Sequence, residues 1–387
     1  MRLHWRPLPY GRGSVLSAKK NFSMRITRIV NDLLYVPLSR PRAAPSEEAA
    51  GRLNHIVVLL VHVHTETGLT GLGFAYNLQG SGRALLALAE DDLAPLLVGE
   101  NALDHERLAA KVYWRLQTIG RRGLVQQAYS AIDLALWDLK GKAAGLPLYK
   151  LLGGARESAA VYGSDTAWLW MSPEQIIDAS RPYLDQGMMG IKVKVGADPE
   201  ADADRLTRIR EALGDDVWLG VDANERYDYG TALAMGHFFE EEIGADWFEE
   251  PISCEDVAGH ARLASKLEIP IAAGEMLFGQ DEFRLYLERD ALAVMQPDVT
   301  RLGGLTGWLK VAALAEAHRV PLSPHLLPEV GVHLACGLPS VTSVEYMPWL
   351  YPLFTNPPHI EQGRLVPQSG PGLGLEVDAH AVAKYRK

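Results

Sequence analysis

The sequence is poor in cysteine and has no long apolar run. Its 387 residues include two cysteines, Cys254 and Cys336, which form no C-x-x-C pair and cannot build a disulfide framework. We therefore expect a reducing, cytoplasmic location with both thiols buried as small apolar side chains. The longest apolar run, Ile56–Val63, has the length of a strand. A membrane span needs roughly 18–20 residues, so we expect no membrane partner.

Positive charge is also scarce. The chain has 38 lysine and arginine residues against 48 acidic ones, a net charge of −10. This balance argues against a nucleic-acid partner, because phosphate binding needs a basic surface. It stays compatible with an anionic small substrate, since a local cation or metal can outweigh the overall charge. The composition, 48% hydrophobic and 22% charged, is that of a globular protein, and the length indicates two domains.

Residues 1–23 differ from the rest of the chain. They carry five basic residues and no acidic one, and they lack the apolar segment of a secretory signal. The composition is compatible with a transit peptide, but a disordered extension ahead of a domain that begins at Met24 is the simpler interpretation. We therefore leave this segment out of the expected fold.

Residues 24–150 show strand patterns first and helical patterns afterwards, which predicts an α+β domain. Strands are expected near Ile26–Val36, Ile56–Val63 and Thr70–Tyr76, with a polar, proline-containing loop over Pro37–Gly51. Helical periodicity then covers Arg83–Leu97, Leu103–Leu116 and Val125–Ala144, and the last of these is apolar on nearly every face, as in a buried helix.

Residues 151–350 alternate short β-rich runs with helical stretches, which predicts an α/β fold of the (β/α)₈ barrel type. A doubly wound sheet is the alternative, but the Gly68-x-x-Gly71-x-Gly73 pattern lies between two strands and opens no helix. Residues 351–387 are rich in proline and glycine and are expected to pack back on the first domain. The eight expected strands are Ala159–Ser164, Gly190–Val195, Val217–Asp222, Trp247–Glu250, Pro270–Gly274, Ala293–Gln296, Val320–Ser323 and Thr342–Tyr346.

Ionisable residues recur at the ends of seven successive expected strands. Barrel enzymes carry their catalytic groups at the C-terminal ends of the strands. Any single charge there is explained as well by a solvated loop or by capping of the next helix. Seven charges around one axis are costly to bury unless they bind something, so the pattern predicts a single site. The first such residue of each strand is Lys192, Asp222, Glu249, Glu275, Asp298, His325 and Glu345.

Three of these residues are carboxylates from neighbouring strands: Asp222, Glu249 and Glu275. Three converging carboxylates repel one another unless a hard cation lies among them. A ligand set made only of oxygen, without cysteine or clustered histidine, favours Mg²⁺ over zinc. Mg²⁺ keeps open coordination positions, so it would also take the carboxylate of a substrate.

The remaining rim residues suit proton transfer. Lys192 and Lys194 share one face of a strand, and two adjacent ammonium groups should depress each other's pKa until one acts as a base. A strand facing water is the alternative, disfavoured by the apolar residues between the lysines. Asp298 would orient the His325 ring. The alternative is that His325 is a structural histidine in the core or on a loop. Glu345, if protonated, would donate to a developing enediolate oxygen.

These residues lie in motifs that resemble the enolase superfamily, mandelate racemase subgroup, from Met24 to the C-terminus. The resemblance implies that Asp222, Glu249 and Glu275 bind Mg²⁺ and that Lys194 is one base, with Lys192 beside the substrate carboxylate. It implies Asp298 with His325 as the second base, and substrate contacts from Lys192, Asn224 and Glu345. Loops over Pro37–Gly51 and around Tyr76-Asn77 would set specificity. The motifs are Lys192-Val-Lys194, Val221-Asp222-Ala-Asn224, Phe248-Glu249-Glu250-Pro251, Gly274-Glu275, Gln296-Pro297-Asp298, Pro324-His325 and the helix Ala131-Ile-Asp133-Leu-Ala-Leu-Trp137-Asp138-Leu-Lys-Gly141-Lys142.

Within the subgroup, the sequence is most similar to acid-sugar dehydratases of the galactarate and L-talarate type. The resemblance rests on Arg301-Leu-Gly-Gly304 and Glu345-Tyr-Met-Pro-Trp349. It implies removal of the α-proton of a sugar acid and loss of the β-hydroxyl as water, giving a 2-keto-3-deoxy acid, in a homo-oligomer. A racemase or epimerase on the same rim and a non-catalytic, metal-dependent binder of sugar acids remain alternatives.

Overall fold

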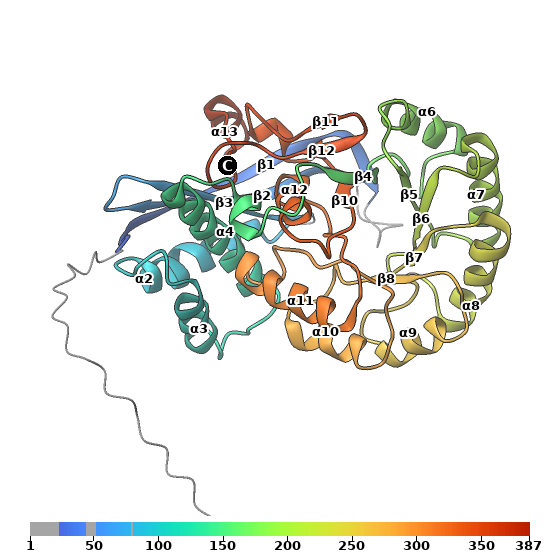
Figure 1. Cartoon of the computed structure of the whole chain (residues 1–387), viewed down its shortest axis with the longest axis horizontal. Coiled ribbons are helices and arrows are strands. Elements are labelled where there is room, and N and C mark those ends of the chain that lie inside the picture. The colour runs from blue at the N-terminus through green and yellow to red at the C-terminus, as the bar shows by residue number, and fades with distance from the viewer. Residues whose placement is uncertain (1–22, 44–51, 79) are drawn as a thin grey trace, which may run out of the picture.

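The computed structural model describes residues 23–43, 52–78 and 80–387, with backbone only at 39–43 and 52–53. The expected extension, residues 1–23, lies outside this range apart from Ser23. Figure 1 shows two parts: a cap domain built from the first third of the chain, and a ring of strands and helices formed by the middle of the chain. None of the described helices is long and apolar enough to cross a membrane.

The cap begins with an antiparallel sheet in the order β1-β2-β3. Its strands are β1 (Ile26–Ala43), β2 (Arg52–Thr65) and β3 (Thr70–Asn77). The expected loop over Pro37–Gly51 is wrong in its first half, because β1 continues to Ala43 and pairs with β2 there after a register shift. Prolines are tolerated in this stretch because β1 is an edge strand, where a missing N–H costs no ladder hydrogen bond. Residues 44–51 lie outside the described range.

The cap helices follow the expected ranges closely. A continuous run comprises α1 (Gly82–Ala87), η1 (Leu88–Leu93) and α2 (Ala94–Leu97), and α3 (His105–Arg115) comes next. The long helix α4 (Leu124–Ala144) is buried along most of its length and precedes the short α5 (Leu148–Leu152). Helix α4 lies directly on β3, and a Cβ atom added at Gly73 would come within 1.9 Å of the Ala131 carbonyl oxygen.

The barrel prediction is confirmed. Six parallel strands pair in chain order, and β10 (Val344–Tyr346) pairs with β4 to close the ring. The seventh expected strand, Val320–Ser323, is reduced to bridges at Leu322 that join it to β9 and to Val341. Pro321 and Pro324 flank this bridge and have no N–H to donate, so a longer ladder cannot form. The six strands are β4 (Ala159–Gly163), β5 (Gly190–Lys194), β6 (Trp218–Asp222), β7 (Trp247–Glu249), β8 (Ile271–Ala273) and β9 (Val294–Met295).

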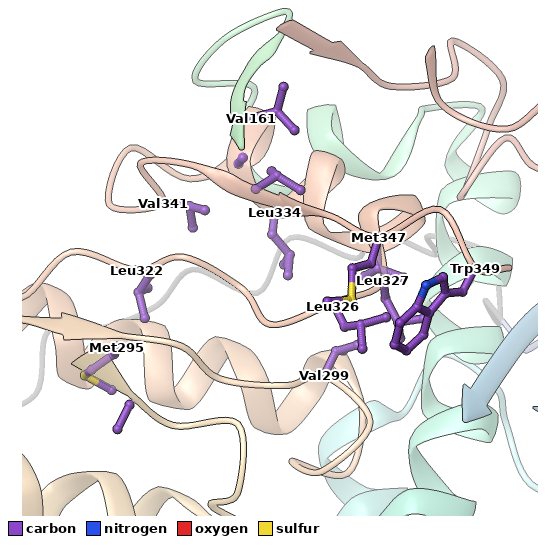
Figure 2. Packing of buried hydrophobic residues seen from close by; sticks show 14 of the residues in the cluster. Val161, Met295, Val299, Leu322, Leu326, Leu327, Leu334, Val341, Met347 and Trp349 are labelled. Atoms are coloured by element: carbon purple, nitrogen blue, oxygen red, sulfur yellow. The ribbon is translucent and has the colours of Figure 1, made fainter. Parts of the chain in front are cut away.

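Helices surround the barrel on its outer side, as Figure 1 shows. Apolar side chains fill the space between strands and helices. In Figure 2, Leu326, Leu327, Met347 and Trp349 pack together beside the loop that follows Leu322. The helices are α6 (Pro173–Leu184), α7 (Pro199–Leu213), α8 (Tyr229–Phe238) with η2 (Phe239–Ile243), α9 (Val257–Ala264), α10 (Gln280–Leu287), α11 (Leu305–His318) and α12 (Pro328–Gly337).

The C-terminal segment contacts both domains. Strand β12 (Arg364–Val366) pairs with β11 (His359–Glu361) and with β4 of the barrel, after the short helix η3 (Tyr351–Leu353). Helix α13 (Ala379–Tyr385) lies against β1 of the cap, and the Phe354 and Phe74 ring centroids are 5.7 Å apart. The segment therefore ties the cap to the barrel.

Both cysteines are free thiols, but they differ in burial. Cys336 is buried, whereas Cys254 is half-buried, so the expectation of two buried thiols is wrong for Cys254. Its position explains the difference, since it stands in the loop after β7 at the rim rather than between strands and helices.

Candidate active site

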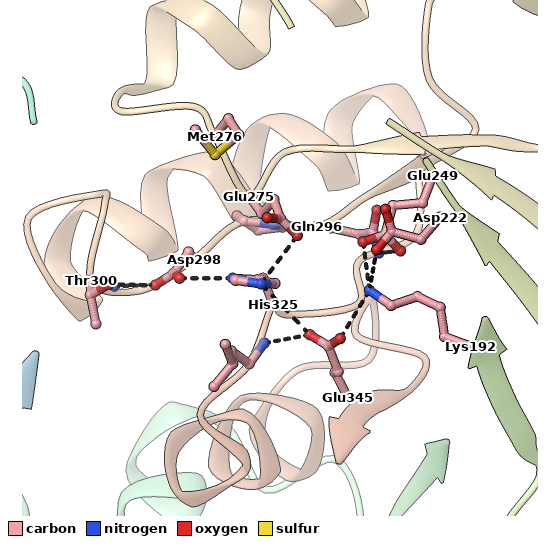
Figure 3. Close-up of polar contacts among 12 residues, drawn as sticks. Lys192, Asp222, Glu249, Glu275, Met276, Gln296, Asp298, Thr300, His325 and Glu345 are labelled. Atoms are coloured by element: carbon pink, nitrogen blue, oxygen red, sulfur yellow. Dashed lines mark hydrogen bonds and ion pairs between the residues drawn. The ribbon is translucent and has the colours of Figure 1, made fainter. Parts of the chain in front are cut away.

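The structure brings the rim residues together at the C-terminal ends of the strands. Figure 3 shows side chains from the ends of β5, β6, β7, β8, β9 and β10, together with His325, converging on one space. Parallel pairing sets this arrangement, because Lys194 lies opposite Asp222 on β6, and Asp222 lies opposite Glu249 on β7. All eight predicted catalytic and metal-binding side chains are buried: Lys192, Lys194, Asp222, Glu249, Glu275, Asp298, His325 and Glu345.

Three carboxylates form a group of the kind that holds a metal ion. Asp222, Glu249 and Glu275 each offer one oxygen, and the three oxygens lie within 4.8 Å of one another. Burial and the neighbouring Asp222 carboxylate raise the pKa of Glu249 well above its usual value. The cost of keeping these charges together, and a donor set made only of oxygen, fit a hard divalent cation such as Mg²⁺.

Two lysines contact this group from β5. The Nζ atom of Lys192 lies 2.6 Å from Glu249 Oε1, 2.9 Å from Glu345 Oε1 and 3.1 Å from Asp222 Oδ2. Lys194 donates a hydrogen bond to the same Asp222 oxygen. The ammonium group of Lys192 therefore lies among three carboxylates, and that of Lys194 contacts one of them.

The expected lowering of the lysine pKa values is wrong for this arrangement. Burial by itself would lower the pKa of Lys194, and the neighbouring Lys192 acts in the same direction. The carboxylates of Asp222, Glu275 and Glu249 together outweigh both effects and raise this pKa. Burial likewise opposes the charge on Lys192, yet Glu249, Glu345 and Asp222 hold its pKa well above the usual value. The sequence shows the two lysines side by side but does not show that carboxylates contact them across the barrel.

His325 and Asp298 form a hydrogen-bonded pair opposite the lysines. His325 Nδ1 lies 2.8 Å from Asp298 Oδ2, and Nε2 lies 3.1 Å from Glu275 Oε2. Asp298 Oδ1 accepts from the backbone N–H and hydroxyl of Thr300 at 2.7 and 2.8 Å. Burial would lower the pKa of His325, but Glu275 and Asp298 outweigh it and raise the pKa above the usual value. The Asp298 carboxylate therefore fixes the ring and favours a proton on Nδ1.

Glu345 lies between the lysine and histidine sides. Its Oε2 accepts a hydrogen bond of 2.7 Å from the Leu326 backbone N–H. Burial would raise the pKa of Glu345, but Lys192 and His325 outweigh it and lower the pKa to about 2. The expected protonated donor is therefore a carboxylate in this structure, because an ammonium group contacts it directly.

Asn224 follows β6 with a left-handed backbone, at a φ of 41°. Its backbone N–H donates to Asp222 Oδ1 at 2.9 Å, and its side chain is half-buried at the rim. The expected substrate contact of the Asn224 amide stays a prediction. The observed contact instead orients the Asp222 carboxylate.

Comparison with known families explains the arrangement. Residues 32–153 match the model of the mandelate racemase / muconate lactonizing enzyme N-terminal domain, and residues 175–381 match the enolase C-terminal domain-like model. The chain belongs to this enzyme family. The predicted resemblance to the enolase superfamily, mandelate racemase subgroup, is thereby confirmed.

Relatives of this family member include several acid-sugar enzymes. The L-talarate/galactarate dehydratase of Salmonella typhimurium is 37% identical, over 92% of this chain and 90% of that protein. The L-talarate dehydratase of Polaromonas sp. JS666, solved with Mg and L-glucarate, has 38% identity and a TM-score of 0.89, covering 94% of this chain and 98% of that one. A racemase from Streptomyces coelicolor with bound magnesium has 31% identity and a TM-score of 0.88, covering 94% of this chain and 100% of that one.

Two residues of this family member take part in the site in ways that the sequence did not indicate. Gln296 Nε2 donates to Glu249 Oε2 at 2.6 Å and orients that carboxylate. Strand alternation could have found it, because Gln296 and Asp298 are two residues apart and share a face. The Tyr76 hydroxyl, from the cap, donates to Asp298. Alternation along β3 places Tyr76 on the face of Leu72 and Phe74 but does not identify what that face meets.

Proposed function

We propose that this chain is a Mg²⁺-dependent acid-sugar dehydratase. The observation that carries the proposal is the group of three carboxylates with a lysine pair on one side and a histidine–aspartate pair on the other. Asp222, Glu249 and Glu275 would hold Mg²⁺, which would bind the substrate carboxylate and stabilise the negative charge of an enediolate. The Mg-bound structures of relatives support this choice of metal.

The side chains on the two sides divide the proton transfers. One base takes the α-proton, the electron pair forms a carbon–carbon double bond, and the β-hydroxyl leaves as water after accepting a proton from an acid. The resulting enol becomes a 2-keto-3-deoxy acid. Lys194 and His325 are the two groups for these roles, with Lys192 beside the substrate carboxylate. Figure 3 shows His325 and Lys192 on different sides of Glu345, so the histidine side and the lysine side of the site lie apart.

The charge around Lys194 sets a condition on its role as a base. Lys194 donates a hydrogen bond to the Asp222 carboxylate, which favours the charged ammonium and helps to raise its pKa. Lys194 would act as a base when the charge of Asp222 is neutralised by another cation, such as the Mg²⁺ that Asp222 would bind. His325 is positioned for the acid role, because Asp298 stabilises its protonated form.

The substrate class follows from the relatives. Galactarate, L-talarate, arabinonate and galactonate dehydratases are all similar to this chain over most of its length. We therefore infer an aldaric or aldonic acid, with galactarate and L-talarate as the first candidates. A racemase or epimerase is the second candidate, supported by the two opposed proton-transfer groups and by the Streptomyces coelicolor relative.

Incubation of the protein with Mg²⁺ and each sugar acid in D₂O separates the alternatives. A 2-keto-3-deoxy product supports dehydration, whereas deuterium at the α-carbon without elimination supports racemisation. Binding without exchange or product would overturn both and favour a non-catalytic binder. A parallel incubation with EDTA is the control, and the proposal requires that chelation stops turnover.

Assembly and location are part of the same proposal. We infer a cytoplasmic homo-oligomer. Exposed apolar side chains on and after α3 support association, since Trp114 is 63%, Ile119 55% and Tyr113 47% exposed. Light scattering measures the state, and a monomer at micromolar concentration would contradict the inference. Replacing Trp114 with glutamate should weaken association if this surface is the contact.

A further inference from the structure

Tyr76 reaches the candidate site from the other domain. It stands near the end of β3 in the cap, on the face of the sheet that points toward the barrel, together with Leu72 and Phe74. The side chain is 2% exposed and belongs to the apolar core that both domains share. A tyrosine buried this deeply needs a partner for its hydroxyl.

The hydroxyl finds its partner in the histidine–aspartate pair. Tyr76 donates to Asp298 Oδ2 at 2.6 Å and lies 3.3 Å from His325 Nδ1. The same Asp298 oxygen accepts from His325 Nδ1 at 2.8 Å. Because Thr300 contacts the other oxygen twice, the Asp298 carboxylate is restrained at both ends. Tyr76 and His325 thus share one Asp298 oxygen atom, and Tyr76 belongs to the cap.

We propose that Tyr76 is a positioning residue, and that its hydroxyl holds the Asp298 carboxylate in the orientation that fixes His325. A carboxylate turns about its bond to Cβ, and the Tyr76 hydrogen bond restrains the oxygen that His325 needs. With Nδ1 held, Nε2 is the nitrogen left to face the carboxylates of the site, 3.1 Å from Glu275. Docking of the cap therefore completes the histidine side of the barrel site. The catalytic consequence rests on the proposed function, whereas the positioning does not.

Tyr76→Phe removes this hydroxyl while keeping the ring in the core. Tyr129→Phe is the matched control, because Tyr129 is also a buried cap tyrosine and its hydroxyl has no hydrogen-bond partner among the described residues. Thermal unfolding of both variants should resemble that of the wild type, which separates positioning from loss of folding.

The first measurement is face-selective deuterium exchange at the α-carbon. Galactarate and L-talarate are epimers at one α-carbon, so in a common pose they present that hydrogen to opposite faces. Lys194→Ala and His325→Asn identify which epimer depends on which side. Tyr76→Phe should slow the His325-dependent exchange by about tenfold and leave the Lys194-dependent exchange within about twofold. An equal effect on both epimers, or on neither, overturns the catalytic part of the proposal.

The second measurement does not need activity. In protein labelled with ¹⁵N-histidine, the His325 Nδ1–H resonance is assigned by its loss in His325→Asn. Tyr76→Phe should shift or broaden this resonance, and Tyr129→Phe should leave it in place. An unchanged resonance in Tyr76→Phe overturns the positioning itself. If Tyr76→Phe shifts the resonance but the wild-type protein exchanges the α-hydrogen of neither acid, the positioning stands and the proposed function is refuted.

Discussion

The buried side chains of the site carry more negative than positive charge. Lys192 contacts the carboxylates of Asp222, Glu249 and Glu345. Lys194 contacts Asp222, and Glu275 contacts His325. A buried group with a surplus of negative charge is costly unless a cation completes it. The individual residues therefore predict separate effects on metal binding and on proton transfer.

Lys194→Ala tests proton transfer. Exchange of the α-hydrogen that faces Lys194 should fall by at least about 100-fold, because a general base contributes that much to a proton transfer. Mg²⁺ affinity should not fall, since the variant removes a cation that competes for Asp222. Lys310→Ala is the control, because Lys310 lies on α11 and contacts Glu106 at 2.7 Å away from the site. Unchanged turnover would remove Lys194 as a base.

Glu249→Gln tests metal binding. The change removes one of three anionic ligands, so Mg²⁺ affinity measured by calorimetry should fall. We expect a loss of at least about tenfold, because removing even a group that only contacts a metal ligand lowers metal affinity by about that much. Glu241→Gln is the control, because Glu241 belongs to a second acidic group with His237 and Glu240 that is more exposed. Equal affinities for the wild type and Glu249→Gln would take Glu249 out of the ligand set.

Helix α4, like the C-terminal segment, connects the cap to the barrel. Its face toward β3 packs against glycines, with the Ala131 and Ala135 backbone where side chains would stand. Its Asp133 accepts hydrogen bonds from the Thr306 backbone N–H and hydroxyl at 2.9 and 2.6 Å, in the first turn of α11. A cap-domain carboxylate therefore supplies the N-terminal contact that α11 lacks in its own sequence.

Gly73→Ala tests the close approach of β3 and α4. The new methyl group would stand 1.9 Å from the Ala131 carbonyl oxygen, so the strand and helix must separate. We expect a loss of about 1–3 kcal/mol in the free energy of unfolding, the usual cost of overpacking, and slower turnover because Tyr76 lies three residues further along β3. Gly279→Ala has open space around the added methyl and serves as the control in urea unfolding. Equal stability of the two variants would contradict this packing argument.

Asp133→Asn tests the buried contact between α4 and α11. Burial raises the pKa of Asp133 to about 7, despite the hydrogen bonds from Thr306. The pKa of an aspartate in an unfolded chain is about 3.9. Between the unfolded pKa and the folded pKa, the folded chain therefore binds a proton that the unfolded chain does not. The contribution of Asp133 to stability is therefore present at low pH and is lost as the pH rises toward 7. The wild type should lose stability across this window more steeply than Asp133→Asn in urea unfolding, and parallel curves would refute the assignment.

At the scale of the whole molecule, the site belongs to neither domain alone. The barrel supplies the carboxylates and the proton-transfer groups, the cap supplies the Tyr76 hydroxyl, and the C-terminal segment pairs with both. A ligand that binds the assembled state and not the unfolded chain stabilises all of these contacts together. Metal binding should therefore be visible in the stability of the entire chain.

Mg²⁺ should raise the unfolding temperature. At a concentration a hundredfold above its dissociation constant, one bound ion stabilises the folded state by about 2.7 kcal/mol. Scanning calorimetry with Mg²⁺ and with EDTA measures the shift, and Glu249→Gln should show a smaller one. The same unfolding temperature in both buffers would contradict a metal site at the barrel rim.

Local patterns in the sequence predicted much of the fold and of the site. Alternating strand and helix patterns predicted eight barrel strands, and seven of them form in the structure. The rule that catalytic groups stand at the C-terminal ends of strands selected the side chains that converge. These inferences hold because periodicity and strand direction are short-range properties. The seventh expected strand is reduced to bridges, and β1 extends further than expected. Both differences arise because a few hydrogen bonds to a distant partner decide whether such segments pair.

The amino-acid sequence by itself determined the order of the elements, the chemical types at the rim and the family. The tertiary structure alone decided the direction in which the pKa values of the two lysines and of Glu345 shift. It also decided the contact between Tyr76 and Asp298, which are 222 residues apart. A pKa depends on which charges lie within a few ångströms, and a contact between domains depends on how their cores pack. Neither distance is encoded in any local pattern.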